Sequence, residues 1–293
     1  MRLLLTGAGG QLGHYLLREL RGGTMQTVAW SRAASGEAFG QPWVPVDLAA
    51  DPLTVERAFH AAQPDVVIHT AAMTTVAACH ADPELARRVN VEATERLVQL
   101  ANSCRARFIF VSTDLVFDGE QGSYREVDTP TPKSVYGESK WDAERAVAKY
   151  ADHVIARMSL LYGPALNGRQ AFFDQQLATI RGTGTCTLFI DEWRTPLSFP
   201  AAAHNLLELA RSTYTGILHL GGPERINRYE MGARMARAFG EDGSNLVVAQ
   251  QADVEFPEPR PHDVSLDSAR WRSLFPLAPW PKLEAAISAF SDE

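Results

Sequence analysis

The feature that most constrains the fold is a glycine-rich turn near the N-terminus. A short apolar run, 3–6, leads directly into Gly7-Ala8-Gly9-Gly10-Gln11-Leu12-Gly13, and a helical pattern then continues to about Arg21. Glycine lets the backbone turn tightly and approach an anion closely, and a helix N-terminus offers unpaired N–H groups and partial positive charge. A strand, a glycine turn and a helix in this order predict a binding site for a dinucleotide pyrophosphate. The alternative is a tight turn without a ligand.

Apolar runs bounded by turn residues alternate with helical patterns in the first half of the chain. The runs are 3–6, 27–30, 44–46, 66–69, 108–112 and 154–158. Such runs are typical of buried parallel strands. Between them, Asp82 and Pro83 form a helix start signal, followed by apolar residues at helical spacing through Leu97 and Ala101. The pattern predicts an α/β fold with a Rossmann-type, doubly wound parallel sheet.

The chain changes character after Gly163-Pro164, where strands and helices alternate less regularly and prolines become frequent. At 293 residues the chain exceeds the usual size of a single domain. We expect residues 1–162 to form the dinucleotide-binding domain. Residues 163–293 are expected to form mainly a smaller C-terminal substrate-binding lobe, with some segments returning to the main sheet.

Composition argues against several functional classes. The 28 basic and 35 acidic residues give a net charge of −7 without a basic face, which argues against a nucleic-acid partner. Cys79, Cys104 and Cys186 form neither a CxxC pair nor a disulfide framework, as expected in a reducing cytosol. No apolar stretch has the length of a signal peptide or membrane span, and the histidines show no metal-ligand spacing. We therefore expect a cytoplasmic protein without a metal site or membrane partner.

Tyr136 and Lys140 are four residues apart and therefore share one face of a predicted helix. A free tyrosine has a pKa near 10, and a cation about 4 Å away can stabilise its phenolate by about 4 kcal/mol. The strand 108–112 is followed by Thr113 and Asp114, at the carboxyl edge of the sheet where α/β proteins form their sites. We predict that Thr113, Tyr136 and Lys140 form a catalytic site. The alternative is a surface helix carrying an incidental pair.

The end of the second predicted strand bears on the choice of dinucleotide. An NAD-selective site usually has an acid there, whereas this chain has Ser31 and Arg32. A guanidinium can pair with the 2′-phosphate of NADPH, so NADPH should at least be accepted. The alternative is a solvated surface arginine. Asp47, followed by Leu48, is a candidate contact to the adenine, with a helix cap or turn as the alternative.

Together these residues resemble the extended short-chain dehydrogenase/reductase family, which uses a GxxGxxG turn, and the closest likeness is to dTDP-4-dehydrorhamnose reductases. The likeness spans most of the chain and is carried by Gly7 to Gly13, Ser112 to Gly119, and Tyr136-Gly137-Glu138-Ser139-Lys140. It implies NADPH or NADH as the cofactor. The cofactor contacts expected from the sequence and the resemblance are Gly7, Gly10, Gln11, Leu12, Gly13, Ser31, Arg32, Asp47, Leu48, Ala71, Ala72, Tyr136 and Lys140.

The resemblance also implies a role for each catalytic residue. Thr113 would hydrogen-bond the substrate carbonyl, and Tyr136 would donate the proton. Lys140 would hold the nicotinamide ribose and lower the tyrosine pKa. Asn90 would have a supporting role, with a helix surface amide as an equally weighted alternative.

Two C-terminal segments resemble those lining the nucleotide-sugar pocket of these reductases. They are Glu192-Trp193-Arg194-Thr195-Pro196 and Arg260-Pro261-His262-Asp263. The guanidinium fork suits a diphosphate, so the substrate contacts expected are Thr113, Asp114, Arg194 and Arg260. Structural salt bridges are the alternative for the two arginines.

Some sugar-facing positions depart from the reductase pattern. Leu115 stands where these reductases tend to have tyrosine, Leu160 stands where they have tryptophan, and 73–80 lacks their charged pattern. The resemblance implies reduction of the keto group of a nucleotide-linked 4-keto-6-deoxy sugar by NAD(P)H. An epimerase or dehydratase of the same family is one alternative. Another is a non-catalytic cofactor-binding subunit similar to the regulatory subunit of methionine adenosyltransferase. A homodimer is common for the fold.

Overall fold

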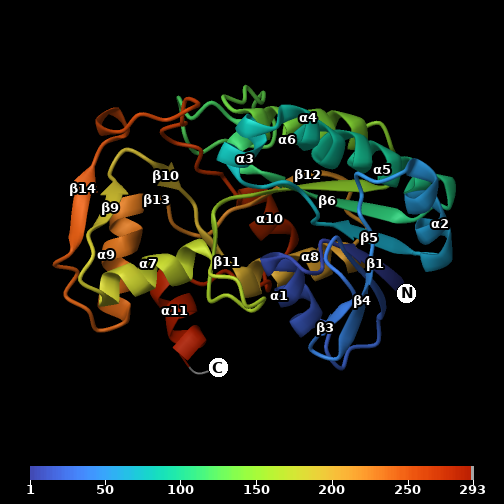
Figure 1. Cartoon of the computed structure of the whole chain (residues 1–293), viewed down its shortest axis with the longest axis horizontal. Coiled ribbons are helices and arrows are strands. Elements are labelled where there is room, and N and C mark those ends of the chain that lie inside the picture. The colour runs from blue at the N-terminus through green and yellow to red at the C-terminus, as the bar shows by residue number, and fades with distance from the viewer. Residues whose placement is uncertain (292–293) are drawn as a thin grey trace.

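A computed structural model describes residues 1–291 of the chain and is built on one eight-stranded sheet (Figure 1). The strand order is β12-β7-β6-β5-β1-β2-β4-β3, and every pairing is parallel except the one between β3 and β4. The strands are β1 (Arg2–Thr6), β2 (Gln26–Ser31), β3 (Gly36–Ala38), β4 (Gln41–Pro45), β5 (Val66–His69), β6 (Arg107–Thr113), β7 (His153–Met158) and β12 (Gly216–Leu220).

Helices cover both faces of the sheet, as Figure 1 shows. Leu3 and Leu5 of β1 pack with α1 (Gln11–Glu19), α8 (Phe199–Arg211) and α10 (Ala269–Leu274). Leu4, between them, points to the opposite face, where α2 (Pro52–Ala62), α5 (Ala93–Ser103) and α6 (Val135–Val147) lie. Successive side chains of a strand point to opposite faces, which is why every residue of this run is apolar. The predicted doubly wound Rossmann-type sheet is confirmed.

The connection from β5 to α5 contains a distorted helix. It consists of α3 (Val76–Ala81), α4 (Pro83–Ala86) and a π-helical turn (Arg87–Glu92). Asp82 caps α4 by accepting a hydrogen bond from the backbone N–H of Leu85 at 2.9 Å, as the sequence predicted. Asn90 lies in the π-helical turn and is buried. Such turns often occur at functional sites.

A smaller lobe lies at one side of the sheet, at the left of Figure 1. It contains α7 (Phe172–Arg181), α9 (Arg228–Ala238) and α11 (Leu283–Ser291), and its core includes Phe173, Met231 and Ile287. Its short strand pairs are β9 (Cys186–Phe189) with β14 (Leu246–Ala249), and β10 (Trp193–Arg194) with β13 (Ile226–Asn227). A further pair is β8 (Leu161–Tyr162) with β11 (Leu197–Ser198), and Gln251–Asp253 is a 3-10 turn. Between these segments, α8 and β12 return to the main sheet.

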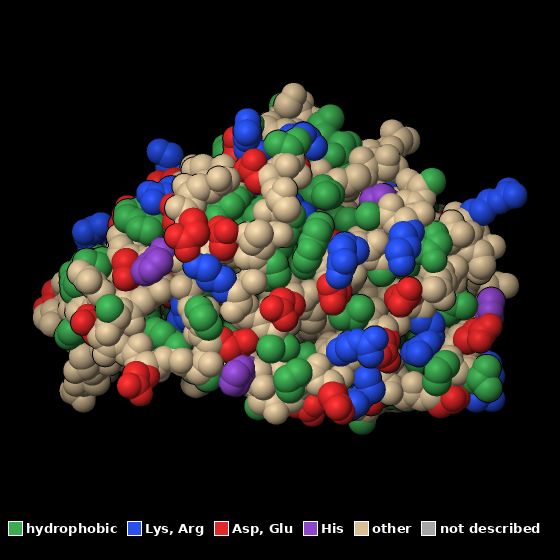
Figure 2. Space-filling view, turned by 90° about the horizontal axis from the view of Figure 1, so that it is seen from above, with side chains coloured by type: hydrophobic (Ala, Val, Ile, Leu, Met, Phe, Trp, Pro, Cys, Tyr) green, Lys and Arg blue, Asp and Glu red, His purple; other side chains and the backbone are tan. Residues whose placement is uncertain are grey.

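The boundaries of several predicted elements differ from those expected. The strand predicted at 44–46 begins at Gln41, and α1 ends at Glu19 rather than near Arg21. The helix that carries Tyr136 and Lys140 ends at Val147. Among residues 1–291, no helix is long and apolar enough to span a membrane. Basic and acidic side chains are interspersed on the face seen in Figure 2.

Candidate active site

Two of the three predicted catalytic residues, Thr113 and Tyr136, lie at the carboxyl edge of the sheet. Thr113 is the last residue of β6 and Tyr136 lies in the first turn of α6, and the threonine hydroxyl is near enough to the phenol to lower its pKa. Ser134 starts the helix because its hydroxyl accepts a hydrogen bond from the backbone N–H of Gly137 at 3.1 Å. A Cβ at Gly137 would lie 3.0 Å from Pro132 and closer still to the carbonyl oxygen of Leu115, so glycine allows the helix to approach this loop.

Tyr136 is protonated at neutral pH in this environment. Burial raises the pKa of its phenol, and the neighbouring Thr113 hydroxyl opposes that shift in part. A phenol of this kind can donate a proton to an oxygen that gains negative charge. The lowering of this pKa by Lys140, implied by the family resemblance, stays a prediction.

Lys140 lies one turn further along α6, on the same buried face as the tyrosine. Its ammonium donates a hydrogen bond to the carbonyl oxygen of Val111 at 2.7 Å and lies 3.9 Å from the centre of the Phe110 ring. Burial lowers the pKa of Lys140 to about 7, while the nearby carboxylate of Glu144 favours the charged form. The group therefore changes charge close to physiological pH.

A buried ion pair fixes α6 against the sheet. Arg157 of β7 binds Glu144 of α6 with Nη2 to Oε2 at 2.7 Å and Nε to the two carboxylate oxygens at 3.0 and 3.1 Å. Both side chains are 1% exposed, and the hydroxyl of Ser112 also donates to Glu144. Because a buried pair of this kind is costly to break, it holds the helix of Tyr136 in register with the strand of Thr113.

Asn90 supports the catalytic helix from below, so its interpretation as a surface amide is wrong. Its Oδ1 accepts a hydrogen bond from the backbone N–H of Met73 at 2.8 Å, and its Nδ2 donates to the Met73 carbonyl oxygen at 3.0 Å. Nδ2 also donates to the hydroxyl of Ser139 at 2.9 Å, and this hydroxyl donates to the carbonyl oxygen of Tyr136 at 2.7 Å. Asn90 thus joins the loop after β5 to α6.

The glycine turn lies between β1 and α1, at the same edge of the sheet. Gly7 has a φ of +76°, and a Cβ there would lie 2.7 Å from the backbone nitrogen of Ala71. A Cβ at Gly13 would lie 2.7 Å from the Cα of Ala8 and would overlap the carbonyl oxygen of Gly7. Gly10 begins α1 without a side-chain cap. The helix N-terminus is therefore open to an anion, as the sequence predicted for a pyrophosphate.

Among the other predicted contacts to the dinucleotide, one side chain is exposed without a partner and others already make hydrogen bonds within the protein. Arg32 is exposed just after β2, and no hydrogen bond or ion pair joins it to the described residues. Ser31 is buried, and its hydroxyl accepts a hydrogen bond from the backbone N–H of Ala33 at 3.2 Å. Gln11 uses its side chain to bind the loop after β8, with Nε2 donating to the Pro164 carbonyl oxygen at 2.5 Å. Arg32 is therefore available to a ligand, whereas the Gln11 side chain is already engaged.

The remaining predicted contacts are Asp47, Leu48, Leu12, Ala71 and Ala72. Asp47 is exposed beyond the end of β4, and its Oδ1 accepts a hydrogen bond from the backbone N–H of Ala49 at 2.9 Å, which is the turn role considered as the alternative. Leu48 is buried, and Leu12 is half-buried against the core. Ala71 and Ala72 are half-buried, and the backbone N–H of Ala71 donates to Thr6 Oγ1 at 3.3 Å.

Three arginines converge on Glu192, where the smaller lobe meets the catalytic edge. Its carboxylate oxygens lie 3.3 Å from Arg194 Nη2, 3.8 Å from Arg228 Nε and 2.6 Å from Arg260 Nη2. Arg194 Nε also lies 3.7 Å from the buried carboxyl of Asp114, which accepts a hydrogen bond from Ser159 at 2.9 Å. The predicted Arg194 and Arg260 are thus brought together, and three guanidinium groups face two carboxyl groups.

Sequence reasoning missed Arg228. Its guanidinium stacks on the ring of Phe172 at 4.1 Å, and burial lowers its pKa to about 10. It is the first residue of α9, where a cation opposes the helix dipole. That unfavourable position was the one signal in the sequence that could have drawn attention to it.

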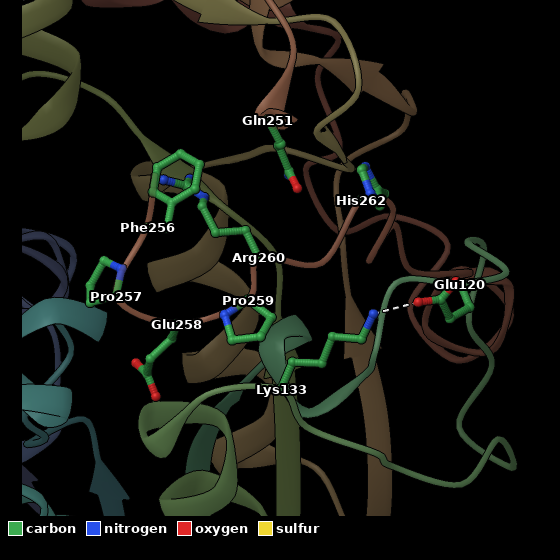
Figure 3. Close-up of a pocket in the computed structure, with 9 residues that line it drawn as sticks. All are labelled: Glu120, Lys133, Gln251, Phe256, Pro257, Glu258, Pro259, Arg260 and His262. Carbon is green, nitrogen blue, oxygen red and sulfur yellow. Dashed lines mark hydrogen bonds and ion pairs between the residues drawn. The ribbon is translucent and has the colours of Figure 1, made fainter. Parts of the chain in front are cut away.

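Arg260 of this cluster also lines a cavity of about 540 Å³, which Figure 3 shows. In that view Arg260 lies along Phe256, and Lys133 pairs with Glu120. Glu258 accepts a hydrogen bond from the backbone N–H of Val135 at 2.8 Å, so the loop touches the helix of Tyr136. The lining residues are Glu120, Lys133, Gln251, Phe256, Pro257, Glu258, Pro259, Arg260 and His262. Thr113 and Tyr136 are not among these lining residues.

Comparison with known families settles where the chain belongs. The family described as RmlD substrate binding domain matches residues 1–292. The chain belongs to this family. Membership confirms the resemblance to extended short-chain dehydrogenase/reductases of the dTDP-4-dehydrorhamnose reductase type. Within residues 1–291, no group of three or more potential metal ligands comes together.

Individual relatives match over nearly the whole chain. A probable low-salt glycan biosynthesis reductase from Haloferax volcanii is 32% identical, covering 91% of this chain and 90% of the relative. The beta subunit of methionine adenosyltransferase 2 from Mus musculus is 28% identical, covering 93% and 82%.

Solved structures agree in fold. A hypothetical dTDP-4-dehydrorhamnose reductase from Sulfolobus tokodaii has a TM-score of 0.84 at 32% identity, covering 97% of this chain and 98% of its own. A dTDP-4-dehydrorhamnose reductase from Bacillus anthracis, in complex with NADP, has a TM-score of 0.88 at 20% identity, covering 99% and 98%. The second likeness concerns the fold alone.

Proposed function

We propose that this RmlD-family protein is an NAD(P)H-dependent oxidoreductase that reduces the keto group of a nucleotide-linked 4-keto-6-deoxy sugar. The observation that carries the proposal is the placement of Thr113 and Tyr136 next to each other at the carboxyl edge of β6, with Lys140 buried on the same helix face. This is an arrangement for delivering a proton to a carbonyl oxygen. The reductases among the relatives support the same class of reaction.

The chain's own residues fit a dinucleotide. Gly7 and Gly13 occupy positions that a Cβ would obstruct, and the uncapped start of α1 faces the same space. Arg32 is exposed at the end of β2, where a 2′-phosphate would lie. We therefore favour NADPH over NADH. The bound cofactor supplies the hydride.

The proton path follows from the contacts around Tyr136. Thr113 and Tyr136 both present hydroxyls to the carbonyl oxygen of the substrate, and Tyr136 Oη transfers its proton as that oxygen gains charge. Lys140, when protonated, stabilises the resulting phenolate electrostatically. Asn90 and the Glu144 to Arg157 pair hold α6, so the two hydroxyls keep their mutual position.

The smaller lobe would bind the rest of the substrate, which makes residues 163–293 mainly a substrate-binding region. Arg194, Arg228 and Arg260 surround Glu192 and leave an excess of positive charge there. Arginine binds phosphate oxygens through its planar fork, so the cluster suits a nucleotide diphosphate. Leu115, which packs beside Tyr136, would contribute an apolar wall near the sugar.

The test is a panel of nucleotide-linked 4-keto-6-deoxy sugars, assayed with NADPH and NADH in parallel. The proposal expects one molecule of reduced dinucleotide to be oxidised for each keto-sugar consumed. Interconversion of sugars without net oxidation would overturn it in favour of an epimerase. Dinucleotide binding without turnover of any sugar would overturn it in favour of a regulatory subunit, the role suggested by the likeness to the methionine adenosyltransferase beta subunit.

A further inference from the structure

His69 forms a buried link that neither the proposed function nor the sequence motifs use. It is the last residue of β5, and its ring lies between two threonine hydroxyls. Nδ1 lies 2.7 Å from Thr6 Oγ1, and Nε2 lies 2.9 Å from Thr94 Oγ1. All three side chains are at most 1% exposed, so water does not compete for these hydrogen bonds.

The partners of Thr94 fix the direction of the hydrogen bonds on one side. Its hydroxyl donates to the backbone carbonyl oxygen of Asn90 at 2.8 Å, and a carbonyl oxygen can only accept. The Thr94 oxygen must therefore accept from His69, which places the ring proton on Nε2.

The partners of Thr6 fix the other side. Its oxygen accepts from the backbone N–H of Ala71 at 3.3 Å, and its hydroxyl proton is free to be donated to Nδ1. With a neutral imidazole that carries its proton on Nε2, every donor and acceptor in this series of hydrogen bonds has a partner.

The link joins the two halves of the site. Thr6 and Ala71 lie at the glycine turn, since a Cβ at Gly7 would come within 2.7 Å of the Ala71 nitrogen. Thr94 holds the backbone of Asn90, whose amide reaches Ser139 of the catalytic helix at 2.9 Å.

The ring of His69 is also close to the catalytic lysine. It stacks on Phe110 with ring centres 5.8 Å apart, and the same Phe110 ring lies beneath the ammonium of Lys140. An imidazolium at this place would repel that ammonium, so the neutral ring suits the site electrostatically.

We propose that His69 is a positioning residue, held as the neutral tautomer with its proton on Nε2. It fixes the position of the glycine turn relative to Asn90, which holds the catalytic helix. The inference rests on the proposed function for its effect on turnover. Its effects on ring protonation and dinucleotide binding can be measured whether or not a sugar is reduced.

The first test is nitrogen NMR of protein labelled in its histidine rings, at pH 7. The His69 signals are assigned by their loss in His69→Gln. We expect an unprotonated Nδ1 and a protonated Nε2. A proton on Nδ1, or fast exchange between the two tautomers, would overturn the proposal.

The second test compares Thr94→Val with Thr94→Ser, which differ in whether the hydroxyl is kept. We expect the valine variant to raise the Kd for NADPH about tenfold and to lower kcat, as for the loss of one buried hydrogen bond, with the keto-sugar KM unchanged. The serine variant should stay within about twofold of the wild type.

A purely structural role for Thr94 would lower Tm and leave Kd and kcat of the folded protein unchanged, which would contradict the proposal. The same holds if the serine and valine variants bind NADPH equally well. If no keto-sugar is reduced by the wild type, the proposed function fails, but the ring tautomer and the NADPH Kd still test the role of His69.

Discussion

The ammonium of Lys140 donates a hydrogen bond to the carbonyl oxygen of Val111 at 2.7 Å. This contact brings a charged group under the sheet edge at which Thr113 and Tyr136 meet. The surrounding protein lowers the pKa of Lys140 to about 7, chiefly through burial, so the charge on which the proposed chemistry depends is sensitive to pH.

The pH dependence of keto-sugar reduction should therefore follow Lys140. Below pH 7 the lysine is charged, and Tyr136, whose pKa is raised, stays protonated, so kcat/KM should be level. Above about pH 7 the ammonium loses its proton, and kcat/KM should fall about tenfold per pH unit. The measurement is a pH profile with saturating NADPH. A profile that is flat to about pH 9 would show that Lys140 does not control the reaction.

Lys140→Met should make the protein more stable while removing its activity. A lysine whose pKa is lowered in the folded state reduces the free energy of unfolding. The reduction is complete below pH 7 and becomes smaller as the pH rises towards 10.5. The cost is at most about 5 kcal/mol at the lower end. Denaturant unfolding should show that Lys140→Met raises the free energy of unfolding more at pH 6 than at pH 9. The exposed Lys149→Met is the matched control, and a loss of stability in Lys140→Met at pH 6 would refute the argument.

Arg32→Ala should change the choice of dinucleotide. The exposed guanidinium has no partner among the described residues and is placed to meet a 2′-phosphate. We expect the Kd for NADPH to rise about tenfold and that for NADH to change little, since only NADPH carries the phosphate. Titration with both dinucleotides measures this. An equal rise in the Kd for NADPH and for NADH would argue that Arg32 is a solvated surface arginine instead.

Arg228→Ala should weaken binding of the nucleotide sugar without affecting the dinucleotide. The variant removes one of the three guanidinium groups around Glu192, and a lost charged contact to phosphate should raise the sugar KM about tenfold or more. Arg237→Ala, exposed on the same helix, is the control. An unchanged sugar KM in Arg228→Ala would remove the cluster from the substrate site.

The fold was largely predictable because its signals are local. Leu3, Leu4 and Leu5 form a continuous apolar run that is typical of a strand buried on both faces, and Gly7 marks the turn that follows. The return of β12 to the sheet was not located, because its pairing with β7 joins Gly216 to Val154 across α7, β9 and α8. Local sequence patterns do not indicate which distant strands pair.

The site was predictable where one segment carries the chemistry and less so where distant segments combine. Tyr136 and Lys140 are neighbours on one helix, so spacing alone placed them together. Arg228 meets Glu192 only through the packing of α9, and the bond between His69 and Thr94 crosses from β5 to α5. Each of these pairings depends on tertiary contacts that no motif encodes.

The most direct measurement of the central claim is the turnover of Tyr136→Phe with the keto-sugar that the wild type reduces. This variant keeps the ring and removes only the hydroxyl that Thr113 contacts. We predict that kcat falls by about a thousandfold or more, with the Kd for NADPH within about twofold of the wild type. A variant that retains full activity would contradict the assignment of Tyr136 as the proton donor.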